Sequence, residues 1–162
     1  VERSRGLGDV YKRQVYRWSS KDGYSIVPNS QGTWPNGIDM IDEDLYVNYR
    51  GNGKITKFSS NTSKDLILRT YLNGGPDNVT AVGDELWIGG QNTDLGGLNC
   101  IPEDVIQCSM PFFIIRADRD LNILEEYNFK DVAYGGASVA YPFEDKIFIG
   151  AYKSDRIAIF KR

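Results

Sequence analysis

Three oxygen-bearing side chains stand at the same place in a repeated phrase of this sequence. Asn36, Asp77 and Ser138 each lie nine residues before the start of an aromatic-containing segment, LYVN, LWIG and IFIG respectively. Repeats of this kind place equivalent side chains around one axis, so we expect these oxygens, with Asn78 beside Asp77, to share one site. Carboxylate, amide and hydroxyl oxygens without His or Cys partners suit Ca²⁺, which takes about six to eight oxygen ligands.

Turn chemistry offers a second explanation for the same residues. Asn, Asp and Gly are frequent before strands because their side chains bond to nearby main-chain groups or because they tolerate unusual backbone angles. The phrases WPNGI and GGPDNV therefore also fit ordinary β-turns. Spacing alone leaves both interpretations open.

Short strands must position these residues. Runs rich in β-branched and aromatic residues alternate with turn signals such as GNG at 51–53 and GGP at 74–76. A second apolar segment follows each aromatic-containing one, and no helical period is sustained, apart from one short candidate at 102–108. The first six predicted strands lie at 15–18, 25–28, 37–41, 45–49, 54–58 and 66–72.

The spacing of the repeat is typical of propeller blades. The first two aromatic-containing segments start 41 residues apart and the next two 61 apart, which an insertion at 91–110 accounts for. Propeller repeats have a period of about 40–45 residues, and a closed ring takes about four to eight of them. We therefore expect an all-β fold, a partial β-propeller of about three blades over residues 15–162, truncated at its N-terminus.

The first 14 residues stand apart from this pattern. VERSRGLGDVYKRQ lacks an initiator Met and resembles the translated sequencing-adapter tails found at the ends of metagenomic reading frames. We interpret residues 1–14 as a non-native tail that takes no part in the fold. A genuine disordered arm is the alternative.

Composition excludes several classes of function. The chain has a net charge of −3 and no run of clustered Lys or Arg, which argues against nucleic acid as the main partner. No apolar run approaches the ~18 residues of a membrane span. Because the sequence contains no His, His-based triads and His zinc sites are excluded within this segment.

The two cysteines, Cys100 and Cys108, both lie inside the insertion. A disulfide between them would close a small loop and stabilise it by about 2–3 kcal/mol. Such a bridge would favour a periplasmic or secreted protein, because disulfides persist in oxidising compartments. The alternative is two unrelated reduced thiols, which would leave the location open.

Taken in order, WPNGI…LYVN, GGPDNV…LWIGG and GGASVA…IFIGAYKSDRIAIF resemble the C-terminal half of the calcium-dependent six-bladed propellers. These are the paraoxonase/arylesterase, strictosidine synthase-like and gluconolactonase (senescence marker protein) families. The resemblance runs from about Val15 to the C-terminus. It implies that a catalytic Ca²⁺ is bound by Asn36, Asp77 and Asn78, and that the substrate pocket is lined by Trp34, Gln91, Ser138 and Tyr152.

The same resemblance implies hydrolysis of a lactone or related ester by the parent protein. Calcium would polarise the substrate carbonyl, and Asp77, the only carboxylate among the implied ligands, is the candidate catalytic residue. The further acidic and amide ligands that these families supply upstream are absent here. We therefore expect this segment to be inactive without the missing N-terminal blades. Strictosidine synthase-like chemistry and a non-catalytic interaction scaffold remain alternatives.

Overall fold

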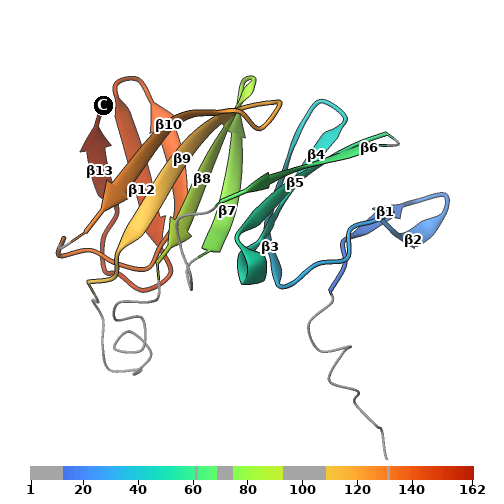
Figure 1. Ribbon diagram of the computed structural model, residues 1–162, viewed down its shortest axis with the longest axis horizontal. Helices are drawn as coiled ribbons and strands as arrows, with labels where there is room; N and C mark the ends of the chain where they lie inside the picture. Colours follow the sequence, from blue (N-terminus) through green and yellow to red (C-terminus); the bar gives the residue numbers. More distant parts are fainter. Residues whose placement is uncertain (1–12, 61, 69–74, 93–108, 131) are drawn as a thin grey trace, which may run out of the picture.

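The computed structural model describes residues 13–60, 62–68, 75–92, 109–130 and 132–162, and in these ranges the structure is almost entirely β (Figure 1). The predicted all-β fold is confirmed. An N-terminal hairpin is formed by β1 (Tyr16–Ser19) and β2 (Gly23–Ile26). The first sheet consists of β3 (Pro35–Ile41), β4 (Asp44–Tyr49), β5 (Lys54–Ser59) and β6 (Thr62–Ile67), with a 3-10 turn, η1 (Arg50–Asn52), after β4. The second sheet consists of β7 (Gly75–Val82), β8 (Glu85–Gln91), β9 (Phe112–Asp118) and β10 (Ile123–Phe129), and the third of β11 (Ala137–Phe143), β12 (Lys146–Ala151) and β13 (Ala158–Lys161).

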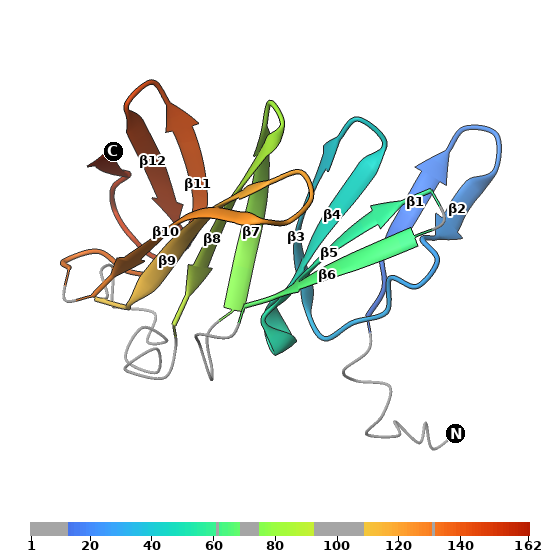
Figure 2. The ribbon, with the colours of Figure 1, turned by 45° about the horizontal axis from the view of Figure 1, so that its top comes forward.

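Each sheet is an antiparallel meander whose strands pair in chain order. Figure 2 shows the hairpin and the three sheets following one another side by side, from the blue N-terminal strands to the red C-terminal ones. Strand β7, the first strand of the second sheet, packs against both β3 and β11, the first strands of its neighbours. This arrangement agrees with consecutive propeller blades, while the number of blades in a complete ring stays a prediction.

Strand alternation divides the apolar side chains between two interfaces. Leu86 and Ile88 of β8 face the first sheet, where they belong to one core cluster with Tyr46 and Ile55. The intervening Trp87 faces the third sheet and packs in a second cluster with Ile147. Because successive side chains of a strand point to opposite faces, one strand contributes to both cores. Trp87 therefore packs between the second and third sheets.

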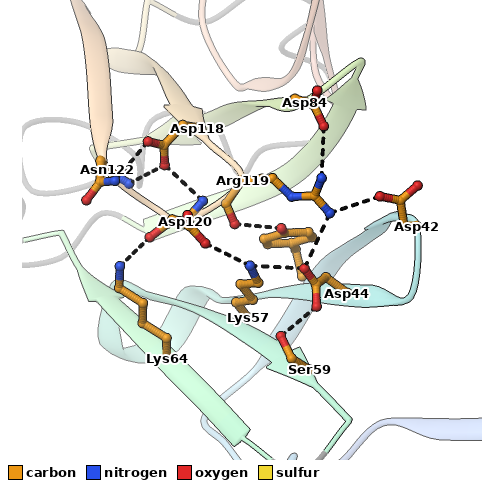
Figure 3. Close-up of polar contacts among 11 residues, drawn as sticks. Asp42, Asp44, Lys57, Ser59, Lys64, Asp84, Asp118, Arg119, Asp120 and Asn122 are labelled. Carbon is orange, nitrogen blue, oxygen red and sulfur yellow. Dashed lines mark hydrogen bonds and ion pairs between the residues drawn. The ribbon is translucent and has the colours of Figure 1, made fainter.

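Charged side chains join the first two sheets at the end where the β3–β4 and β7–β8 hairpins turn (Figure 3). Arg119 pairs with Asp42 at 2.9 Å and with Asp84 at 3.1 Å, so one guanidinium links both hairpin turns. Lys57 lies 3.0 Å from Asp44, which also accepts a hydrogen bond from Ser59. This network fixes the two sheets at one end of the molecule.

Several expectations concern residues outside the described ranges. The proposed tail is described only at residues 13 and 14, and the insertion only at its ends, so Cys100 and Cys108 are among the residues not described. In the parts of the chain that the structure describes, no helix has the length and apolar character needed to cross a membrane.

Candidate functional site

The candidate oxygen ligands lie at β-bulges. The register of the first hairpin of each sheet shifts at these residues, which are Asn36 and Gly37 in β3, Asp77 and Asn78 in β7, and Ser138 in β11. A bulge inserts an extra residue into one strand and redirects its side chains, and bulges are frequent beside active sites. The repeated spacing in the sequence thus corresponds to a repeated irregularity of the backbone.

The three bulges also adjoin one another across the sheets. A Cβ on Gly37 would lie 2.5 Å from the Asn78 Cα and 2.5 Å from the Asp77 main-chain oxygen, so only Gly allows this approach. A Cβ on Gly89, which lies opposite the second bulge, would be 2.9 Å from the main-chain oxygen of Ser138. The structure therefore brings the first bulge next to the second, and the strand opposite the second bulge next to the third.

Asp77 is the charged centre of this region. Its side chain is largely buried, and its Oδ2 accepts a hydrogen bond of 2.7 Å from the Gln91 Nε2. The Nη1 of Arg50 lies 3.6 Å from the same oxygen and donates to the Gln91 Oε1. Gln91 is fully buried and also donates to the main-chain oxygen of Ala137. One polar network therefore connects all three sheets.

Asn48 adds a second buried amide to the network. It lies opposite the first bulge, and its Nδ2 donates to the Asp77 main-chain oxygen at 3.2 Å. Its Oδ1 is buried without a hydrogen-bond partner among the described residues. A buried oxygen without a partner costs about 1–3 kcal/mol, so this position suits a water molecule or a cation.

The remaining predicted site residues lie at the same end of the sheets but are more open. Asn36 is exposed, while Asn78 and Ser138 are half-buried. Trp34 and Tyr152, with 47% and 58% of their surfaces exposed, are accessible enough to contact a ligand. Trp34 adopts a left-handed backbone conformation, with φ of 54°, that is uncommon for a bulky residue. Its carbonyl accepts a hydrogen bond from the Arg50 main-chain N–H.

Arg50 and Asn48 were not among the site residues predicted from the sequence. The repeat contains a signal for Arg50, because Arg50, Gln91 and Tyr152 are separated by the same intervals of 41 and 61 residues as Asn36, Asp77 and Ser138. Gln91 and Tyr152 were predicted, and Arg50 stands in the same position. Asn48 has no such signal, since Gly89 stands opposite the second bulge.

The residues at the bulges offer oxygen donors of the kind that Ca²⁺ takes, with a single negative charge among them. Asn36, Asp77 and Asn78 offer amide and carboxylate oxygens from adjoining strands, and the Oδ1 of Asn48 is a further oxygen without a partner. Within the described ranges, no group of three or more Asp, Glu, His or Cys side chains is placed to hold a metal ion. A site with one carboxylate and several amides would bind Ca²⁺ weakly, since affinity depends on ligand charge.

No protein-family model matches this sequence, and no curated protein matches it. The features that bear on a function are the repeated bulges and the polar network around Asp77.

Proposed function

We propose that this chain is part of a calcium-dependent hydrolase that acts on lactones or related esters and is built on a six-bladed propeller. The observation that carries the proposal is the set of three bulges with oxygen side chains at equivalent positions, in neighbouring hairpins whose backbones touch. The resemblance of the repeated phrases to the calcium-dependent propeller families supports it. The side chains at the bulges are hard oxygen donors with no sulfur or imidazole ligand among them, which supports calcium as the cofactor.

The residues around Asp77 have separate roles in this proposal. Asn36, Asp77 and Asn78 would hold the ion, and a bound Ca²⁺ supplies a Lewis acid for the substrate carbonyl. Gln91 keeps the Asp77 carboxylate in place through its 2.7 Å hydrogen bond. Asn48 fixes the main chain of the same residue. The more open side chains at this end would contact the substrate, namely Trp34, Ser138 and Tyr152.

The proposal also needs further blades, and the outer face of the third sheet fits one. Trp87 is covered by the third sheet, whereas its counterpart in the repeated phrase, Phe148, is only half-buried. Phe148 pairs in register with Tyr141 and with Ile159, which are 50% and 59% exposed. An apolar face of this kind suits another sheet of the same polypeptide, which would also supply the remaining calcium ligands.

One observation favours a second candidate, a non-catalytic propeller that serves as an interaction scaffold. Arg50, Asp77 and Gln91 contact one another and connect to the third sheet, as a purely structural polar network would. In that case the carboxylate would be needed for packing and not for metal binding. The two candidates make different predictions for the removal of its charge.

Calcium binding by the Asp77→Asn variant separates these candidates. We expect millimolar calcium to raise the melting temperature of the wild-type chain, and chelation to reverse the shift, because a ligand that binds only the folded state stabilises it. The variant should bind calcium about tenfold or more weakly, while Asp145→Asn, at an exposed hairpin turn, should behave as wild type. Equal binding by Asp77→Asn and wild type, or no calcium effect on either, would contradict the proposal. Lactone hydrolysis by the chain joined to its further blades should be lost in the same variant.

A further inference from the structure

We infer that Arg50 is a resident counter-cation of the proposed calcium site, which competes with the metal ion for the Asp77 carboxylate and so sets the concentration at which the ion binds. The inference depends on the proposed function, because it concerns the regulation of the same site. It is carried by the position of the guanidinium, by its partners and by the charges that face Asp77.

The backbone of Arg50 is firmly held beside the second bulge. Its N–H donates to the Trp34 carbonyl at 3.0 Å. Its own carbonyl lies against Gly75 at the start of β7, where a Cβ would approach the Arg50 oxygen to 2.2 Å. The side chain therefore starts from a fixed point next to the strand that carries Asp77.

The guanidinium and the carboxylate are close but are not directly hydrogen-bonded. Arg50 Nη1 is 3.6 Å from Asp77 Oδ2, whereas its hydrogen bond goes to the Gln91 Oε1. Asp77 in turn receives its hydrogen bond from the Gln91 amide. If Arg50 moves away, Asp77 keeps this partner and its position. The geometry thus allows a calcium ion to replace the Arg50 guanidinium beside Asp77 while the hydrogen bond between Asp77 and Gln91 is kept.

The charges explain why an exchange is needed. The two residues that hydrogen-bond to Asp77, Asn48 and Gln91, are neutral, so Arg50 balances the carboxylate. A calcium ion bound to Asp77 would lie within a few ångströms of a guanidinium that cannot lose its proton. The side chain of Arg50 is 23% exposed, which gives it a route into solvent on its flexible aliphatic stem. Calcium binding is therefore coupled to the departure of Arg50.

The test is the calcium affinity of Arg50→Gln, measured by calorimetric titration of the 162-residue chain with calcium chloride. Removal of the competing charge should lower the dissociation constant for calcium about tenfold. The effect is no larger because solvent weakens the repulsion between the ion and the partly exposed Arg50 side chain. Arg156→Gln is the matched control, because Arg156 is exposed and pairs with the adjacent Asp155. It changes the net charge equally and should leave the affinity within about twofold of wild type.

A second measurement covers the case in which Arg50→Gln does not fold. In the wild-type chain, saturation with calcium should shift the side-chain N–H signals of Arg50 in the NMR spectrum, assigned by their loss in Arg50→Lys. If the wild type binds calcium, but Arg50→Gln binds no tighter or the Arg50 signals do not move, Arg50 is not a competitor and the inference is wrong. If neither the wild type nor the variants bind calcium, the proposed calcium site itself is refuted.

Discussion

The close contact between the first two bulges makes Gly37→Ala a sharp test of the structure. A Cβ at this position would meet three main-chain atoms of β7, the Asp77 oxygen and the Asn78 Cα at 2.5 Å and the Val79 nitrogen at 2.7 Å. Ordinary contacts of carbon atoms lie at about 3.5–4.0 Å, so the two strands must separate by about 1 Å. Main chain cannot rotate away from the new methyl group as a side chain can. The strain must therefore spread into the interface between the first and second sheets.

Overpacking of this kind typically costs about 1–3 kcal/mol, and we expect a value near 3 kcal/mol because every contacting atom belongs to the backbone. For a chain of this size, that corresponds to a fall in melting temperature of about 6–12 °C. Urea unfolding measures the free energy directly, with the fluorescence of the buried Trp87 as one reporter of the second sheet. The variant should also bind calcium more weakly, since Asn36 moves away from Asp77.

Gly150→Ala is the matched control for this experiment. Its Cβ would meet only a side-chain atom, Cγ1 of Val139, at 2.7 Å, and Val139 is half-buried and can adjust. We expect a loss of about 1 kcal/mol for this variant. If Gly37→Ala is destabilised no more than Gly150→Ala, then β3 and β7 are not in backbone contact, and the argument that their bulges form one site is refuted.

Two further predictions concern the turn-end network and the exposed face of the third sheet. The pKa of Asp44 lies below its ordinary value of 3.8, first because Ser59 donates a hydrogen bond to it and then because Lys57 lies beside it. Asp44→Asn should therefore lower the free energy of unfolding by about 1 kcal/mol near neutral pH. The difference between variant and wild type should disappear as the pH falls through the lowered pKa that Asp44 has in the folded state. Urea unfolding at several pH values measures both effects. The exposed apolar face of the third sheet should make the chain self-associate, so Ile159→Ser should reduce self-association in sedimentation velocity while changing stability by about 0.5 kcal/mol or less. Ile123→Ser, on the second sheet, serves as the control, and equal association of both variants would argue against the third-sheet face as the cause.

The fold was predictable from the sequence because its signals are local and repeated. Strands such as LWIG combine β-branched and aromatic residues, and turn residues separate them at regular intervals. The side-by-side order of the sheets follows from the same repeat. The sequence did not reveal which faces of the sheets are covered. Trp87 has the third sheet over it, whereas Phe148, its counterpart in the repeated phrase, is half-buried.

The site was predictable only in part, for a different physical reason. The spacing located Asn36, Asp77 and Ser138 at equivalent positions, since a period in sequence becomes a period in structure. It gave no sign that Asp77 would be buried beside Gln91 and Arg50. Those contacts join residues of different sheets, and long-range pairings of polar side chains depend on how the sheets pack.

The three repeats differ from one another mainly at the bulge end of their sheets, which supports a site there. The strand phrases that build the cores are alike in all three sheets, as LYVN, LWIG and IFIG illustrate. At the bulge end, equivalent positions instead carry different chemistry, with Arg50, Gln91 and Tyr152 at the end of the second strand of each sheet or directly after it. A bulge needs no particular polar side chain to form, so backbone geometry alone does not account for this variety. Two of these groups, Arg50 and Gln91, contact the buried carboxylate of Asp77, as the recognition of an asymmetric ligand would require.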